Sequence, residues 1–131
     1  MARRLISSGG PWEARSGYSR AVAVGDECFV SGTTDAGKDG LSLHPGNPRG
    51  QAEAILLIIR RALEAAGFTM ADVVRTRMFV TDRAHIEPVT TVHGEIFGEI
   101  RPAATIVVVG ALIDPTLLVE IEADARREAQ P

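Results

Sequence analysis

The sequence predicts one α+β domain in which a single sheet carries two helices on one face, with the element order ββαβαββ. Short apolar runs bounded by turn residues predict the strands, and two longer stretches of three- and four-residue periodicity predict the helices. The 131 residues suit one hydrophobic core, and 45% hydrophobic and 24% charged residues are ordinary for a globular protein. We therefore expect residues 1–131 to form a single domain.

The first two strands are predicted as a hairpin. Residues 19–24 and 27–30 are apolar runs on either side of Gly25-Asp26, and such a pair of turn residues favours an antiparallel connection. Cys28 lies within the second run, where a small buried hydrophobic residue is expected rather than a nucleophile.

A surface loop and the first helix follow. Residues 35–48 are dense in glycine, proline, Asp and Asn, which favour turns over regular structure. Residues 51–66 then show one apolar helical stripe, and Gly67 is a natural stop for the helix. The stripe comprises Ala54, Ile55, Ile58, Ile59, Ala62 and Leu63.

The third strand and the second helix come next. Residues 72–80 alternate as a strand, and the two arginines on one of its faces, Arg75 and Arg77, indicate an edge or solvent-facing position. The second helix is expected to begin near Ile86, because Pro88 is tolerated in a first turn but would break a helix interior. Its apolar stripe comprises Val89, Val92, His93, Ile96, Phe97 and Ile100.

The last two strands are predicted at residues 105–109 and 117–125. Every residue of the first run after Thr105 is apolar, which is typical of a strand buried on both faces. The two helices can cover only one face of the sheet, so the other face needs a partner. The simplest partner is another copy of this chain.

The final strand carries an acidic face that has two interpretations. Strand alternation places Leu118, Glu120, Glu122 and Asp124 on one face, and Val119, Ile121, Ala123 and Ala125 on the other. The acidic face is either a solvated edge or the wall of a cleft between subunits. In a cleft, partial burial would raise the pKa of one of the two glutamates and let it hold or activate water.

Other candidate ligand contacts are weaker signals. The segment Ser31-Gly32-Thr33-Thr34 offers three hydroxyl groups and a glycine that permits close approach of a ligand, although a plain polar strand exit is the commoner explanation. Tyr18 could present its hydroxyl group to a pocket or simply pack down the terminus. His93 lies near the apolar stripe of the second helix, which favours a packed histidine over a base.

Charge and motif content disfavour several functions. The chain has 14 Lys and Arg against 17 Asp and Glu, a net charge of -3, and lacks a basic run that could follow a phosphate backbone, so nucleic acid is not an expected partner. No segment approaches the ~18 apolar residues of a membrane helix, and no secretory leader is visible, so we expect no membrane partner and a cytoplasmic location. The spacing of the three histidines predicts no metal site, and the sequence shows no phosphate loop, dinucleotide fingerprint or GxSxG nucleophile elbow.

Several short motifs together resemble the Rid/YjgF family, the reactive intermediate deaminases that are also labelled L-PSP endoribonucleases. The motifs follow the family's order and spacing through nearly the whole chain. They are Gly17-Tyr18-Ser19, Val30-Ser31-Gly32, Val73-Val74-Arg75, Met78-Phe79-Val80-Thr81-Asp82, Pro102-Ala103-Ala104-Thr105 and Leu118-Val119-Glu120-Ile121-Glu122-Ala123.

The resemblance implies a chorismate-mutase-like fold, assembled as a homotrimer around a central barrel, with clefts between neighbouring subunits. It implies a small-molecule ligand, because active members hydrolyse enamine and imine intermediates without a cofactor of their own. By position, Glu120 matches the carboxylate that positions the attacking water. The candidate site comprises Glu120 as the catalytic residue and, as substrate-binding residues, Tyr18, Ser31, Gly32, Thr33, His93, Ala104 and Thr105.

One position departs from the family's pattern. Deaminases of the family have an arginine directly after the Pro-Ala pair, where it binds the substrate carboxylate, and this chain has Ala104 there. Arg101 is a poor substitute, because an odd offset along an extended segment points to the opposite face. Arginines on other strands, such as Arg20, Arg75 and Arg77, are further candidates for the missing cation. We therefore expect an arginine-lacking member of the family, in which the usual imine deamination is weak.

Three functions remain open at this stage. The first is a small-molecule hydrolase, or deaminase-like enzyme, that uses Glu120 and water. The second is a metabolite-binding or regulatory trimer without turnover, for which Ala104 is the main argument. The third is an endoribonuclease, which is disfavoured because an acidic chain with few aromatic residues offers an RNA strand little to bind.

Overall fold

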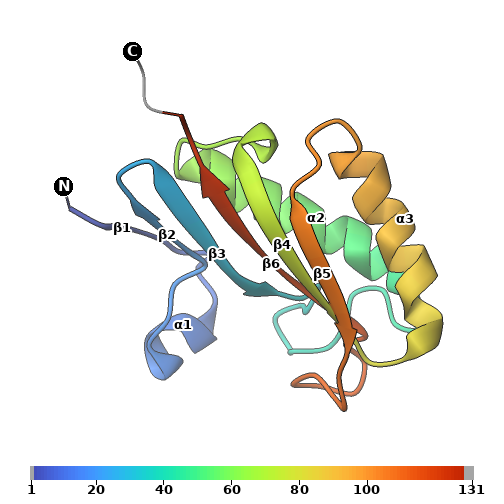
Figure 1. Cartoon of the computed structure of the whole chain (residues 1–131). Helices are drawn as coiled ribbons and strands as arrows, with labels where there is room; N and C mark the ends of the chain where they lie inside the picture. Colours follow the sequence, from blue (N-terminus) through green and yellow to red (C-terminus); the bar gives the residue numbers. More distant parts are fainter. Residues whose placement is uncertain (1, 129–131) are drawn as a thin grey trace.

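The computed structural model describes residues 2–128, at whose centre lies a six-stranded sheet in the order β1-β2-β3-β6-β4-β5 (Figure 1). The strands are β1 (Arg4–Ile6), β2 (Ala21–Val24), β3 (Glu27–Thr33), β4 (Val73–Val80), β5 (Ala103–Val108) and β6 (Val119–Arg126). The helices are α1 (Pro11–Ser16), α2 (Pro48–Ala65) and α3 (Ile86–Phe97), with short 3₁₀ turns η1 (Met70–Asp72) and η2 (Arg83–His85). The β4–β5 pair is parallel and the other pairs are antiparallel. The predicted α+β class is confirmed.

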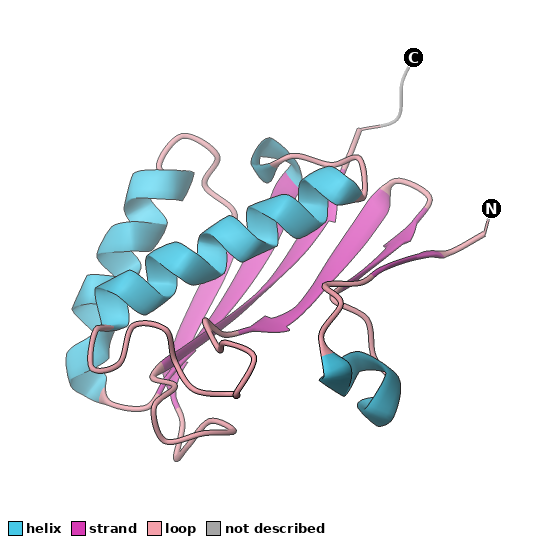
Figure 2. Cartoon of the chain, turned by 180° about the vertical axis from the view of Figure 1, so that it is seen from behind, coloured by secondary structure: helices cyan, strands magenta, loops and turns pink. Residues whose placement is uncertain are grey.

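Two helices, α2 and α3, cover one face of the sheet, as predicted (Figure 2). α2 starts at Pro48 rather than at residue 51, because Asn47 caps it by accepting a hydrogen bond from the backbone N–H of Gly50. Within residues 2–128, none of the helices is long and apolar enough to cross a membrane. The apolar residues that the two helices bury are Ala52, Ile55, Leu56, Ile59, Ala62, Leu63, Val89, Val92 and Phe97.

The predicted order ββαβαββ is correct from β2 onward but omits β1 and α1. β1 has only three residues, and two of them are exposed, so the segment shows no apolar alternation. α1 has six residues, too few for a helical stripe to appear in the sequence. β1 pairs with β2 and thereby lengthens the sheet by one strand.

The alternation predicted for β6 is confirmed. Its odd-numbered residues from Val119 to Ala125 are buried under the helices. Its even-numbered residues, Glu120 and Glu122 among them, are only partly buried and point to the opposite face, which no helix of residues 2–128 covers. The sequence therefore predicted correctly which face of the sheet carries the acidic side chains.

The arginines of β4 are solvent-facing, the second of the two predicted possibilities, because β4 itself lies between β6 and β5 and is not an edge strand. Its arginines still avoid the core, since they share the uncovered face with the acidic residues of β6. There, Nη1 of Arg77 lies 3.2 Å from Oε1 of Glu122 and 3.4 Å from Oδ2 of Asp124. Ion pairs across neighbouring strands therefore hold these two carboxylates.

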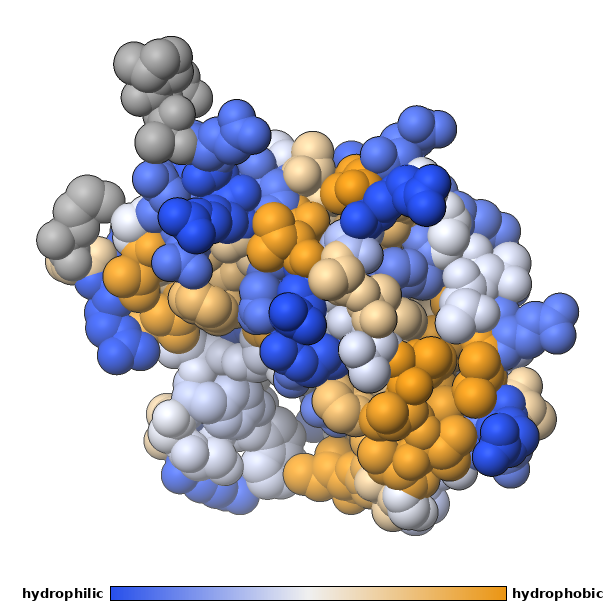
Figure 3. All heavy atoms as spheres, in the orientation of Figure 1, coloured by the Kyte–Doolittle hydropathy of each residue, from blue (hydrophilic) through white to orange (hydrophobic). Residues whose placement is uncertain are grey.

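The edge strand is β5, and within one chain it is not buried on both faces as its apolar sequence suggested. Val107 and Val108 point to opposite faces and are 42% and 46% exposed. Figure 3 shows hydrophobic side chains gathered over the end of β5 and the loop that follows it. Ile106 packs partly against the core beneath the helices, whereas Val108 on the same face of β5 stays half-exposed.

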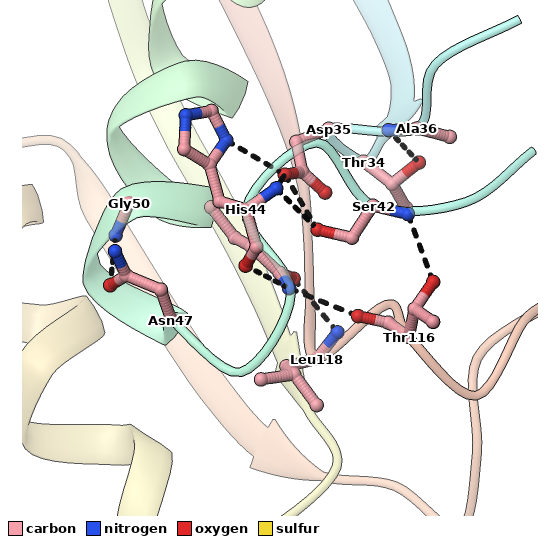
Figure 4. A network of polar contacts seen from close by, with 10 residues as sticks. Thr34, Asp35, Ala36, Ser42, His44, Asn47, Gly50, Thr116 and Leu118 are labelled. Carbon is pink, nitrogen blue, oxygen red and sulfur yellow. Dashed lines mark hydrogen bonds and ion pairs between the residues drawn. The ribbon is translucent and has the colours of Figure 1, made fainter.

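The loop between β3 and α2 is anchored by hydrogen bonds and is only partly exposed. Asp35 is 1% exposed, and its Oδ2 accepts hydrogen bonds from the hydroxyl group of Ser42 at 2.8 Å and from the backbone N–H of His44 at 3.0 Å (Figure 4). The backbone N–H of Ser42 donates to Oγ1 of Thr116 at 2.9 Å, and Nε2 of Gln51 donates to the carbonyl oxygen of Thr116 at 3.0 Å. These bonds fix the loop against α2 and the segment that leads into β6.

Candidate functional site

Glu120 lines a cavity of about 600 Å³ that lies between the end of β3, the beginning of β6, α1 and the segment before β2. Four of the predicted site residues meet here, namely Tyr18, Ser31, Gly32 and Glu120. A cavity of this size admits a small metabolite. The structure thus brings together half of the residues that the sequence proposed for the site.

Gly32 allows the carboxylate of Glu120 to lie against the backbone of β3. A Cβ atom at residue 32 would collide with Oε2 of Glu120 and come within 3.2 Å of its Cδ. A β-bulge between Val30 and Thr33 turns Gly32 toward β6 in this way. The glycine is therefore needed for a close approach between backbone and side chain.

We expect Gly32→Ala to displace the Glu120 carboxylate while leaving the fold nearly as stable. The added methyl group meets the far end of a flexible side chain, which can rotate into another staggered conformer. Activity or ligand binding that depends on Glu120 should fall by about tenfold or more, because a misplaced catalytic group loses its near-attack geometry. Assays beside a thermal unfolding scan check this, and full activity in the variant would show that the observed position of Glu120 is not required.

The environment of Glu120 strengthens it as a base. Burial raises the pKa of this carboxyl group above its usual value, the guanidinium of Arg20 opposes the shift, and the charge of Glu122 adds to it. A carboxylate with a raised pKa accepts a proton more readily than an exposed glutamate does. This environment suits a group that holds or activates water.

Ser31 and Tyr18 are fixed around the cavity by backbone contacts. The hydroxyl group of Ser31 donates to the carbonyl oxygen of Ser19 at 2.6 Å, and its backbone N–H donates to the carbonyl oxygen of Arg20 at 3.0 Å. The backbone N–H of Tyr18 donates to the carbonyl oxygen of Glu13 at 2.9 Å, and its side chain remains 43% exposed. Because its proton is donated to Ser19, the Ser31 hydroxyl group can accept a hydrogen bond from a ligand, whereas the Tyr18 hydroxyl group can donate or accept one.

Of the three arginines that the sequence suggested for the missing cation, Arg20 lines the cavity, whereas Arg75 and Arg77 do not. Nη2 of Arg20 donates a hydrogen bond of 2.5 Å to the carbonyl oxygen of Gly32. The available signal was its spacing, since Arg20 follows Tyr18 by two residues and an extended segment points both side chains the same way. That signal does not reveal the contact with Gly32, which depends on how two strands meet.

Thr33 and His93 do not line this cavity. The bulge in β3 turns Thr33 into the core, where its hydroxyl group donates to the carbonyl oxygen of Ser31 at 2.7 Å. His93 lies on the covered face of the sheet, with Nε2 2.8 Å from Oγ1 of Thr76 and its ring 4.7 Å from that of Phe97. Burial lowers the pKa of His93, which favours the neutral imidazole. This placement fits a packed histidine.

Ala104 and Thr105 also lie away from Glu120 within one chain. Both belong to β5, which β4 separates from β6, and both are exposed. Arg101, in the segment before β5, is exposed and does not line the cavity either. These residues can meet a Glu120 cavity only if β5 of one chain approaches the cavity of another.

Neither a metal cluster nor a reactive thiol occurs among residues 2–128. No group of three or more His, Cys, Asp or Glu side chains lies close enough together to hold a metal ion. Cys28 is buried without a disulfide partner, and burial raises the pKa of its thiol, which disfavours the nucleophilic thiolate. The chemistry of the cavity therefore depends on its carboxylates, its hydroxyl groups and the guanidinium of Arg20.

Comparisons with known proteins agree with this fold. The family model described as endoribonuclease L-PSP matches residues 11–127. The crystal structure of Rv2704 from Mycobacterium tuberculosis, a member of the YjgF/YER057c/UK114 family, has 46% sequence identity and a TM-score of 0.87, and the match covers 96% of this chain and 100% of that one.

The uncharacterized protein SCO2049 of Streptomyces coelicolor is 36% identical over 128 residues, which are 98% of this chain and 95% of the relative. The RutC family protein PH0854 of Pyrococcus horikoshii is 32% identical over 111 residues, 85% of this chain and 87% of the relative. The chain is therefore a member of the Rid/YjgF family, whose family model carries the description endoribonuclease L-PSP.

Proposed function

We propose that this chain is a small-molecule hydrolase in which Glu120 activates water in a cleft completed by a neighbouring subunit. The observation that carries the proposal is the partly buried carboxylate of Glu120, held against Gly32 inside a cavity of about 600 Å³. The hydroxyl groups of Tyr18 and Ser31 line the same cavity and supply hydrogen-bonding partners for a ligand.

The proposed reaction uses Glu120 as a general base. The ionised carboxylate accepts a proton from a water molecule, and the water oxygen attacks an electrophilic carbon of the ligand. The proton then passes to the departing nitrogen or oxygen, and Glu120 returns to its ionised form. Hydrogen bonds that the ligand makes with the hydroxyl groups of Tyr18 and Ser31 hold it so that its carbon stays within reach of the water.

The cleft is proposed to form between the subunits of a homotrimer with a central barrel. β5 is largely exposed on both faces, and it carries Ala104, at the position of the arginine in the family's deaminases, with Thr105 beside it. A neighbouring chain that brought its β5 to the Glu120 cavity would complete the pocket and cover the exposed valines at once. Two observations support this arrangement: Val107 and Val108 are exposed in one chain, and Ala104 and Thr105 lie away from Glu120 there.

A binding protein without turnover is the second candidate, and Ala104 favours it. The arginine that the family's deaminases have at this position makes charge-assisted hydrogen bonds of roughly 1.5 to 3 kcal/mol each with a substrate carboxylate. Losing one of these bonds weakens binding of the transition state by about tenfold to a hundredfold. Such a trimer could still hold a metabolite and report its concentration to a partner.

An endoribonuclease is the third candidate, because the family model carries that name. The net charge of -3 and the carboxylates of Asp39, Asp114 and Glu120 around the cavity repel a phosphate backbone. RNA therefore serves best as the control in a test of the hydrolase.

A substrate panel tests the proposed function. The purified protein is incubated with imines, acyl compounds, lactams and an RNA, and product release is followed for each. We expect turnover of at least one small-molecule class and an intact RNA. Binding of a panel compound without any product would favour the regulatory trimer instead, and RNA cleavage that follows the protein through further purification would favour the nuclease.

A further inference from the structure

We propose that Arg20 is the anion-binding residue of the Glu120 cavity and that it selects ligands that carry a single carboxylate group. The proposal rests on the proposed function for the place where the ligand binds, but it does not depend on turnover. It assigns to the segment before β2 a contact that the family's deaminases make from the position of Ala104.

The guanidinium of Arg20 is oriented by the protein. Its Nη2 donates a hydrogen bond of 2.5 Å to the carbonyl oxygen of Gly32, the same residue against which the Glu120 carboxylate lies. A guanidinium has five N–H donors, so this bond fixes its position and leaves most of its donors for other acceptors. The cation and the proposed base are thus both anchored on Gly32.

Arg20 has no carboxylate within ion-pair distance among residues 2–128, although Glu13 and Glu120 attract it at longer range. No Asp or Glu among residues 2–128 forms an ion pair with it, and its buried Nε finds no hydrogen-bond acceptor there. Glu13, which attracts it at longer range, is already engaged through Oε2 by the backbone N–H and the hydroxyl group of Ser8. Arg77, in contrast, has two carboxylates within ion-pair distance.

A desolvated cation is incompletely compensated when its nearest carboxylates, those of Glu13 and Glu120, lie beyond ion-pair distance. Burial lowers the pKa of Arg20, yet an arginine remains protonated at neutral pH, so the side chain loses hydration and keeps its charge. Such a charge is unfavourable unless an opposite charge and hydrogen bonds compensate it. An anionic group that arrives with the ligand supplies both.

The surroundings of Arg20 limit the anion to one charge. Asp39, Asp114 and Glu120 line the same cavity, so a doubly charged phosphate group would meet three carboxylates and a single guanidinium. A planar carboxylate can accept two parallel hydrogen bonds from a guanidinium. The ligand class is therefore small monocarboxylates whose reactive carbon can reach the water held by Glu120.

The test compares butanoate with its neutral, nearly isosteric amide, butanamide. Both are titrated into the assembled wild-type protein and its variants, and dissociation constants are measured by ligand-observed NMR. The wild type should bind butanoate about tenfold or more tightly than butanamide. Arg20→Gln should bring this ratio close to one, and Arg20→Lys, which keeps the charge but not the planar donor pair, should retain part of it.

A matched control removes an equal charge elsewhere. Arg60→Gln alters an exposed arginine on the outer side of α2 and should leave the acid-to-amide ratio unchanged. Loss of the support that Arg20 gives to Gly32 would weaken both ligands alike, so the ratio separates anion binding from a structural role. No binding of butanoate by the wild type, or a ratio that survives Arg20→Gln, overturns the proposal.

The binding test of Arg20 can succeed or fail independently of the substrate panel that tests the proposed hydrolase. Binding of butanoate through Arg20, together with no turnover in the substrate panel, refutes the hydrolase and upholds the anion site. Turnover that depends on Glu120 but is unchanged in Arg20→Gln would uphold the hydrolase and refute the anion site.

Discussion

Glu120→Gln should lower kcat/KM for the hydrolysed panel compound by about a hundredfold or more while the protein keeps its fold and assembly. Glutamine preserves the shape of the side chain but cannot accept the proton of the attacking water, and general-base catalysis contributes roughly 10²- to 10⁴-fold. Steady-state kinetics beside sedimentation analysis checks both halves of this expectation. Unchanged turnover in a correctly assembled variant would remove Glu120 from the mechanism.

The pH dependence of the same reaction follows from the environment of Glu120. Burial, the main cause, raises the pKa of its carboxyl group above the ordinary value of 4.5, so this group loses its charge at a higher pH than an exposed glutamate does. Hydrolysis should therefore decline as the pH falls toward that raised pKa, and residual activity of Glu120→Gln should lack this decline. A wild-type rate that stays constant down to pH 4.5 would contradict a base with a raised pKa.

The same shift predicts the effect of the substitution on stability. The folded-state pKa of Glu120 is above the unfolded value, so the folded state holds the proton more firmly, and stability falls as the pH rises through the interval between the two values. At neutral pH the ionised carboxylate is therefore a destabilising group. Glu120→Gln should unfold at the same temperature as the wild type or at a higher one, which separates lost catalysis from lost structure.

Glu122→Gln is the matched control for these measurements. Glu122 lies two residues further along the same face of β6, but its carboxylate pairs with Arg77 at 3.2 Å instead of lining the cavity. Its removal should leave the rate within a few-fold of the wild type. Because the charge of Glu122 helps to raise the pKa of Glu120, the acidic limb of the pH profile should move slightly toward lower pH.

Strand alternation predicted the face of Glu120 because β6 is regular. Its burial alternates without interruption from Val119 to Ala125, so the odd and even positions can be read directly from the sequence. In β3 the same rule fails at Thr33, because the bulge after Val30 adds a residue and reverses the alternation. A bulge is set by pairing with the neighbouring strand, which the sequence of β3 alone does not contain.

Long-range polar contacts were the other part that the sequence could not show. The loop after β3 contains the turn residues that predicted a surface loop, yet Asp35 is buried because Ser42 and His44 donate hydrogen bonds to it. The role proposed for Arg20 likewise depends on its contact with Gly32 on another strand. Periodicity identifies which residues face a core, whereas these contacts arise only after the segments have packed.

A charged residue at position 107 should break the assembly. Val107 lies on the face of the sheet that no helix among residues 2–128 covers, and it is 42% exposed in one chain. Phe29, which is 45% exposed, and Phe79 share this face, so several apolar side chains on it remain uncovered in one chain. If a second copy provides that cover, an unpaired charge buried there is unfavourable by several kcal/mol.

The measurement is sedimentation at micromolar concentration. The wild type should sediment with about three times the mass of one chain, whereas Val107→Asp and Val107→Lys should sediment as single chains or fail to fold. Substitutions of both charges are needed, because an aspartate at position 107 could form an ion pair with the neighbouring Arg77, whereas a lysine could not.

Leu57→Asp provides the control that gives this result its meaning. Leu57 lies on α2 and is 45% exposed, so a charge there tests a general intolerance of charged substitutions at half-exposed apolar positions. The trimer should survive it, since α2 covers the opposite face of the sheet. A wild type that sediments as a stable single chain would refute the trimer, and with it the proposal that a neighbour's Ala104 and Thr105 complete the cavity of Glu120. Equal disruption by Leu57→Asp would instead show that the effect at Val107 does not identify the interface.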